Sequence, residues 1–183
     1  AATLNDGLAL GGNMETFEVK RGLVKKLAAE GGLAGVAGKH FDNVDGSGDS
    51  FSGSHGIMTS IAGEYNALGK LVVDVSQVLP DFKDEEAMAE AQDDRSRWFA
   101  FLDEATGYNS KQRGDKAKEN AKKASKAKSG INQARKFMEM ATNISDETKA
   151  EAESMIEEIE AALEAGDNTK AAGRAEKLGK LLG

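Results

Sequence analysis

The stretch SDETKAEAESMIEEIEAALEAGDNTKAAGRAEKLGKLLG, residues 145–183, organises the chain because it predicts two helices joined by a short turn. Apolar residues recur at helical steps of three and four, which places them on one helix face: Ala152, Ile156, Ile159 and Leu163, then Ala171, Ala175, Leu178 and Leu182. Ser145 supplies an N-cap oxygen, Gly166 is suited to end the first helix, and Asp167 to start the second. We therefore predict an antiparallel hairpin whose apolar stripe is covered by other helices.

Further helices are predicted upstream of this hairpin. Acidic residues beginning near Lys83 suit a helix N-terminus, and Gly107 is suited to end that helix. A long helix follows over residues 110–143, with an alanine-rich seam. Another helix is predicted over residues 57–79, ended by Pro80, because apolar residues again recur at steps of three and four: Ile57, Ile61, Tyr65, Leu68, Val72, Val75 and Leu79.

The N-terminal third is rich in glycine. Residues 1–13 predict an extended arm that becomes ordered only against a partner, and residues 17–30 a short amphipathic helix. Residues 31–41 contain too much glycine for a helix, and residues 42–56 have the composition of a polar loop. The predicted fold is all-α, a four-helix up-down bundle over residues 57–183. Residues 1–56 form an arm, an extra N-terminal helix and a loop.

Composition limits the classes of function. The 183 residues include 24 Lys and Arg against 31 Asp and Glu, a net charge of -7, which disfavours nucleic acid as a partner. There is no cysteine, so disulfides and thiolate metal sites are excluded. No apolar run approaches the roughly 18 residues of a membrane-spanning helix. Ala1 at the start fits a terminus left by removal of a targeting peptide, and fits a trimmed chain equally well.

No motif for catalysis, cofactor binding or metal binding is recognised. His40 and His55 lie near several aspartates, which allows a zinc hypothesis, but no helical spacing of His or Glu presets such a site. The segment 42–56 fails as a calcium loop in both registers, because position twelve is Ser54 or Gly56 rather than Glu. We predict no catalytic residue, no metal ligand and no cofactor.

The most unusual feature is a basic half-helix. Between Lys111 and Lys128, eight basic residues stand against two acids on a chain that is acidic overall. Such a local field can steer a negatively charged partner, although a solvated helix face is the plainer interpretation. We predict a docking surface at Lys116, Lys118, Lys122, Lys123, Lys126 and Lys128. Trp98 and Phe99 point to different helix faces, so one of them is a candidate exposed anchor, although packing in or beside the core is the plainer interpretation. Trp98 is included in the predicted site.

The C-terminal half has a resemblance to one family. The acidic run DETKAEAESMIEEIEAALEAG, the turn and the ending EKLGKLLG resemble the PsbQ-like extrinsic proteins of photosystem II, over residues 83–183. That resemblance implies a four-helix bundle in the thylakoid lumen that supports the oxygen-evolving centre without catalysis. Two features depart from the family: the alanine- and lysine-rich run 116–128 replaces an aromatic-rich helix, and the predicted helix over residues 57–79 is an added element.

The predicted function is that of a non-enzymatic accessory subunit that docks electrostatically on a larger protein complex. A lumenal photosystem subunit is the named candidate, with the thylakoid lumen as its compartment. The alternatives are a secreted or cytoplasmic helical adaptor or scaffold and, from a different class, a small metal-dependent enzyme that uses His40 and His55.

Overall fold

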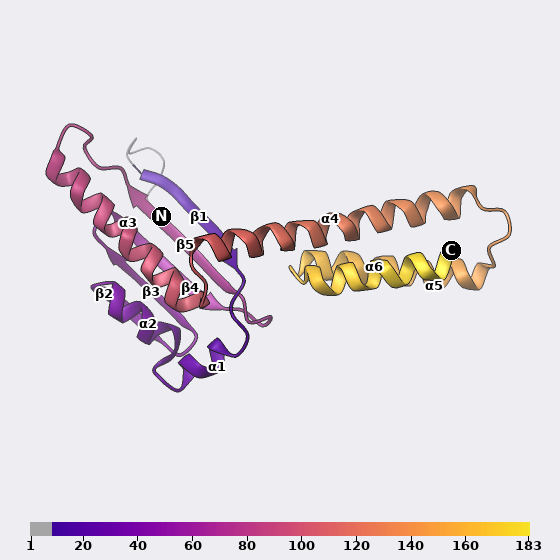
Figure 1. The fold of residues 1–183 in the computed structure, drawn as a ribbon, viewed down its shortest axis with the longest axis horizontal. Helices are drawn as coiled ribbons and strands as arrows, with labels where there is room; N and C mark the ends of the chain where they lie inside the picture. The colour runs from indigo at the N-terminus through magenta and orange to yellow at the C-terminus, as the bar shows by residue number, and fades with distance from the viewer. Residues whose placement is uncertain (1–8) are drawn as a thin grey trace. The chain divides into compact units, whose positions relative to one another are not determined.

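The computed structural model describes the backbone of residues 9–183 and the side chains of residues 14–183 (Figure 1). The chain forms two compact units, Ala1–Gly114 (unit 1) and Asp115–Gly183 (unit 2). Unit 1 contains a five-stranded antiparallel sheet, so the all-α prediction is wrong: the fold combines this sheet with six helices within the described residues. The predicted boundary after residue 56 falls inside unit 1, in the turn between two strands.

The sheet of unit 1 has the strand order β1-β5-β4-β3-β2, and all neighbouring strands are antiparallel. Its strands are β1 (Ala9–Phe17), β2 (Asn43–Ser47), β3 (Ser50–His55), β4 (Met58–Tyr65) and β5 (Leu71–Val78). Three helices accompany it: α1 (Leu23–Ala28) and α2 (Gly32–His40) between β1 and β2, and α3 (Glu85–Thr106) after β5.

One face of the sheet bears the core of unit 1. Along β5, Leu71 and Val73 are buried while Asp74 is exposed, which is the alternation of a sheet covered on one side only. Helices α2 and α3 pack on the covered face, as Figure 1 shows, and their largest buried residues are Leu33 and Phe101. The core of unit 1 therefore contains side chains from the N-terminal helices, from the sheet and from α3.

The predicted helix over residues 57–79 is the main error, because this segment forms strands β4 and β5. A step of four is even, so residues such as Ile61 and Tyr65 share one face of a strand just as they would share one face of a helix. Many residues here are β-branched, which favours strands. A turn separates the strands: the Asn66 side chain accepts hydrogen bonds from Leu68 N and Lys70 N, at 3.0 Å each.

The glycine-rich segment was also predicted wrongly, since residues 31–41 include helix α2 and residues 42–56 form the β2–β3 hairpin. Tertiary contacts outweigh the low helix propensity of glycine here. A Cβ on Gly32 would lie 2.5 Å from the carbonyl oxygen of Gly48, so glycine permits α2 to approach the hairpin. In the hairpin, Phe51 is buried and stacks on Phe41. This contact holds the otherwise polar strand β3 against the core.

The predicted N-terminal arm corresponds in part to a strand. Residues 9–13 belong to β1, which pairs with β5, whereas residues 1–8 lie outside the described residues. The predicted short helix within residues 17–30 is found as α1, which begins only after Gly22. Gly22 adopts a positive φ of 86° and therefore precedes the helix rather than lying in it.

The later helices lie where the sequence predicts them. Helix α3 is capped by Asp84, whose side chain accepts hydrogen bonds from Glu86 N and Ala87 N, and it ends at Gly107 with φ 77°. The other three are α4 (Ser110–Met140), α5 (Asp146–Glu164) and α6 (Asn168–Leu182). Ser145 and Asp167 cap α5 and α6 as predicted. No helix among residues 9–183 is long and apolar enough to cross a membrane.

Unit 2 is a small helical core. Ile156, Ile159 and Leu178 are fully buried, while Leu163 and Leu182 pack against the edge of the same cluster. Helix α4 contributes small and aliphatic residues, among them Ala127, Ile131, Ala134 and Met138. A Cβ on Gly130 would lie 3.0 Å from that of Ala175, so the absence of a side chain lets α4 approach α6 closely.

Candidate functional site

Three exposed lysines of α4 form a stripe. Lys118, Lys122 and Lys126, here called the lysine face, are spaced four residues apart and all are exposed. At about 100° per residue, they lie on the side of α4 opposite the buried Ala127 and Ala134. The lysine face therefore points to solvent, and the small apolar side chains of α4 pack against α5 and α6.

The other predicted lysines lie outside this stripe. Lys116 and Lys123 are half-buried; Lys116 Nζ is 3.6 Å from Glu119, and Lys123 Nζ donates to the hydroxyl of Thr169 at 3.1 Å. Lys128 is exposed but lies about 80° around the helix from Lys118. Of the six predicted lysines, the structure brings three together in one stripe and leaves the other three outside it.

Trp98 belongs to the core of unit 1 more than to its surface. Its ring centroid lies 5.4 Å from that of Phe101 and 6.0 Å from that of Phe41. Phe99, the neighbour of Trp98 on α3, is 45% exposed. The exposed aromatic residue at this position is therefore Phe99, and Trp98 does not extend into solvent as an anchor.

Phe99 borders an apolar groove that is not predicted from the sequence pattern. This groove, here called the α3 groove, has a volume of about 660 Å³ and lies between the first half of α3 and the segment that follows β5. Its large apolar residues include Leu79, Phe82, Met88 and Phe99. Phe82 is 70% exposed and Met88 38%, so this surface is unusually apolar for one open to solvent. One sequence signal for the groove was present: Met88 and Phe99 lie on a different side of the predicted helix from the buried core residues Phe101 and Ala105.

Both histidines are engaged in contacts that hold α3 on the rest of unit 1. His40 Nε2 lies 2.6 Å from Glu104, which also accepts from Lys39 Nζ at 3.0 Å. Burial by itself would raise the pKa of Glu104, but the hydrogen bonds from His40 and Lys39 outweigh it and hold this pKa below its usual range. These contacts join α2 to the last turns of α3.

His55 is bound from both sides. Its Nδ1 accepts from Asp42 N at 3.2 Å, which assigns the proton of the neutral ring to Nε2, and Nε2 faces Asp94 Oδ1 at 3.4 Å. Asp94 also accepts from Ile57 N at 2.9 Å, and a Cβ on Gly56 would lie 2.0 Å from its Oδ2. Since both ring nitrogens are occupied, this buried cluster fixes the β3–β4 turn and has no free nitrogen for proton transfer to a substrate.

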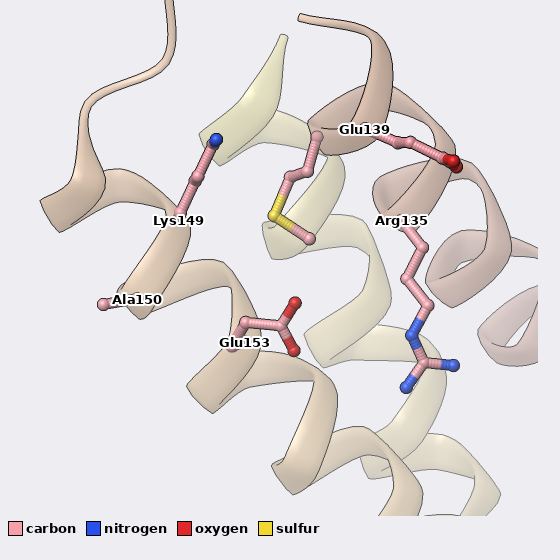
Figure 2. Close-up of a pocket in the computed structure, with 6 residues that line it drawn as sticks. Arg135, Glu139, Lys149, Ala150 and Glu153 are labelled. Carbon is pink, nitrogen blue, oxygen red and sulfur yellow. The ribbon is translucent and has the colours of Figure 1, made fainter.

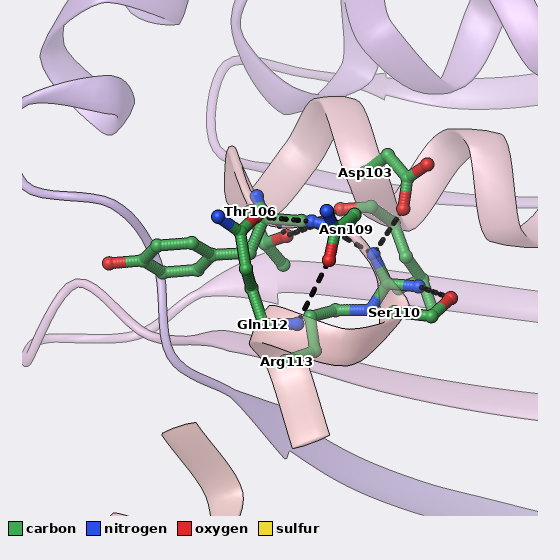
Figure 3. A network of polar contacts seen from close by, with 8 residues as sticks. Asp103, Thr106, Asn109, Ser110, Gln112 and Arg113 are labelled. Carbon is green, nitrogen blue, oxygen red and sulfur yellow. Dashed lines mark hydrogen bonds and ion pairs between the residues drawn. The ribbon is translucent and has the colours of Figure 1, made fainter. Parts of the chain in front are cut away.

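A polar network joins the end of α3 to the start of α4 (Figure 3). The Arg113 guanidinium donates to Asp103, to the Tyr108 carbonyl at 2.6 Å and to the Ser110 hydroxyl at 3.0 Å. Asn109 and Gln112 exchange two hydrogen bonds of 2.9 Å, which caps α4. Arg113 is 7% exposed, so it stabilises this junction and contributes nothing to the basic surface in which the sequence analysis counted it.

A second groove lies in unit 2, between the last turns of α4 and the start of α5 (Figure 2). It has a volume of about 450 Å³ and is bordered by Arg135, Glu139, Lys149 and Glu153. These two positive and two negative side chains leave no net field for a charged ligand. Arg135 is moreover paired with Glu160 at 2.7 Å.

Buried titratable groups elsewhere also have structural partners. The Tyr65 hydroxyl donates to the carbonyl of Ala105 at 2.5 Å, which anchors α3 to β4. Burial, with added repulsion from Asp49 and Glu104, raises the pKa of Tyr65 well above its usual value. Within residues 14–183, no group of three or more His, Asp or Glu side chains is placed to hold a metal ion.

Comparison with known proteins yields one match. The sequence model of a family described as a domain of unknown function, DUF5611, matches residues 14–119. No curated protein and no solved structure matches the chain. The matched residues cover the end of β1, strands β2–β5, α1–α3 and the start of α4. The match ends close to the division between the units after Gly114.

Proposed function

Because the chain belongs to the DUF5611 family, a domain of unknown function, we propose its role from its own geometry: a non-enzymatic accessory subunit that docks on a larger protein assembly. The docking surface is the lysine face of α4. The observation that supports this proposal is the alignment of Lys118, Lys122 and Lys126, all exposed, opposite the seam that packs on α5 and α6.

Electrostatics sets the character of such docking. Exposed ion pairs contribute only about 0–1 kcal/mol each, so no single lysine dominates the binding free energy. Three charges in one stripe act together on a partner, mainly by raising the rate of association. Salt weakens this attraction because the Debye length is about 10 Å at 0.1 M. We therefore expect a fast and salt-sensitive interaction.

The proposed partner is a protein surface rich in carboxylates. A net charge of -7 opposes binding to a nucleic acid, whose phosphates would meet repulsion from the rest of the chain. An accessory role is also favoured over metal catalysis, because His40 and His55 are each occupied by different carboxylates. A photosystem as the assembly, and the thylakoid lumen as the compartment, stay predictions. The five-stranded sheet of unit 1 departs from the four-helix architecture that the photosystem resemblance implied.

The test is charge reversal on the lysine face. Wild-type protein and the double variant Lys122→Glu/Lys126→Glu are immobilised, incubated with native extract and eluted over a salt series. We expect the wild type to retain a defined set of acidic proteins that elute together with rising salt. The variant should lose the same proteins at the lowest salt used, with unchanged helix content by circular dichroism.

A matched control is provided by α1. Lys25 and Lys26 are exposed, and their double change to Glu alters the net charge by the same amount in unit 1. This control variant should bind as the wild type does. Equal retention by the wild type and the Lys122→Glu/Lys126→Glu variant at every salt concentration would show that the lysine face is only solvated. Retention of nucleic acid in place of acidic proteins would contradict the proposed partner class.

A further inference from the structure

We propose that the α3 groove is a self-association surface, on which two copies of this chain pair with their α3 helices antiparallel. The groove is the largest concentration of exposed apolar side chains among those described in unit 1: Phe82, Met88 and Phe99 all border it. Aromatic residues, Met and Arg are the types enriched at the centres of protein interfaces, and Arg95 lies in the same groove.

The groove residues of α3 lie on one side of the helix. At about 100° per residue, five of them fall within an arc of about 80°: Glu85, Met88, Gln92, Arg95 and Phe99. This arc is separate from the side on which Asp94, Phe101 and Ala105 are buried. A second helix could therefore lie along it without disturbing the contacts of α3 with the sheet.

The order of these residues is self-complementary. In an antiparallel pair of α3 helices in which Glu85 of one copy faces Arg95 of the other, the reverse pair forms at the same time. The same register places Met88 of each copy opposite Gln92 of the other. The proposed interface thus has two ion pairs and an uncharged centre, all generated by one two-fold axis.

The two charges are available for such pairing. Neither the Glu85 nor the Arg95 side chain forms a hydrogen bond or ion pair with the residues described here, although Arg97, two residues further on, pairs with Asp93 at 3.2 Å. Ala89 and Ser96, on the same side of α3, are small and allow close approach of a second helix. A second copy satisfies both charges with a single interface, because each copy brings the acid and the base that the other lacks.

The primary measurement is the mass of the full chain in solution by sedimentation velocity, from about 1 µM to about 1 mM, the range that separates tight from weak dimers. We expect a monomer–dimer equilibrium. Glu85→Arg and Arg95→Glu should each weaken the dimer by at least about tenfold, because each creates two like-charge contacts across the axis.

Mixing the two single variants provides the decisive test of the proposed register. In a mixture of the Glu85→Arg and Arg95→Glu variants, positions 85 and 95 are again oppositely charged across both contacts, so a heterodimer should form. The double variant Glu85→Arg/Arg95→Glu should form a homodimer for the same reason. A matched control is Glu90→Arg, an exposed acid of α3 outside the groove, which should leave the dimer unchanged.

All positions changed are exposed, and melting curves establish that each variant is folded. A wild type that stays monomeric up to about 1 mM would overturn the proposal. So would a dimer that is indifferent to both single reversals, or two single variants that fail to associate when mixed. Restoration in the mixture and in the double variant, with no effect of Glu90→Arg, would establish the antiparallel α3 interface.

Discussion

Phe101 in unit 1 and Leu178 in unit 2 are both fully buried, but the side chains around them differ in kind. The Phe101 ring lies 5.2 Å from Phe41, 5.3 Å from Phe51 and 5.4 Å from Trp98, measured between ring centroids. The core cluster around Leu178 consists, within the described residues, of Ala, Ile, Leu and Met alone. Unit 1 is organised by directional aromatic contacts and unit 2 by small aliphatic packing.

Polar contacts follow the same division. In unit 1, α3 is fixed to the other elements by buried or half-buried pairs, among them Glu104 with His40, Asp94 with Ile57 N, and Tyr65 with Ala105 O. In unit 2 the ion pairs, such as Arg135 with Glu160, are exposed on both sides. A directional core fixes one arrangement of sheet and helix, whereas aliphatic packing tolerates small displacements. The family match covers almost only the directional unit.

The largest effect is expected for Phe101→Ala. Removing this side chain leaves a cavity among three aromatic rings and should lower the free energy of unfolding by about 3–5 kcal/mol. Denaturant unfolding measures the total loss, and hydrogen exchange assigns it to a region. Exchange should rise in β3–β5 and α3 and stay unchanged in α5 and α6. An equal rise in all of these elements would show that the two units unfold together. That result would contradict the view that their cores are independent.

Leu178→Ala tests the other unit. The expected loss is about 2–5 kcal/mol, confined to α5, α6 and the part of α4 that packs on them. Because the surroundings are aliphatic and can partly close the cavity, we expect the lower part of this range. Leu163→Ala is the matched control, since Leu163 is only partly buried and its truncation should cost less. A larger cost for Leu163 than for Leu178 would mean that the hairpin core is placed wrongly.

The difference between the units also explains which parts of the fold the sequence could reveal. In unit 2 the information is local: helical steps, Ser145, Asp167 and the Gly166 turn all act within a few residues, and the hairpin was predicted correctly. In unit 1 the information is distant. Gly32 fits a helix because of its approach to Gly48, and strand β1 forms by pairing with β5, some sixty residues away.

Over residues 57–79, the hydrophobic periodicity could not distinguish a helix from a strand. Residues four apart share a face in both a helix and a strand, so Ile61 and Tyr65 could not decide between them. The consecutive β-branched residues Val72 and Val73, followed by Val75, carried the information that favours a strand.

The candidate sites show the same limit. The sequence identified the basic half-helix, but it could not show that Lys123 contacts Thr169 or that Arg113 is buried. The sequence does not predict the α3 groove, because Met88 and Phe99 could each lie on a buried side of the helix. Only the placement of α3 on the sheet shows which side of the helix remains open.

The smallest effect concerns pH and should again affect only unit 1. The pKa of Glu104 is lowered in the folded state, so its contribution to stability is fully present above the pKa of an unfolded glutamate, about 4.3, and is lost as pH falls through the lower folded value. Glu104→Gln removes this contribution. The variant should therefore be less stable than the wild type at pH 6, and the difference should shrink progressively below about pH 4.

Denaturant unfolding of both proteins between about pH 3 and pH 6 measures this convergence. Glu90→Gln is the matched control on the same helix, because Glu90 is exposed, lies beyond the first turn and forms no ion pair among the residues described. Its difference from the wild type should stay constant across the series. Two stability curves for Glu104→Gln and wild type that run parallel down to pH 3 would mean that the ionised carboxylate is not what joins α2 to α3. The junction would then depend mainly on the apolar packing between α2 and α3.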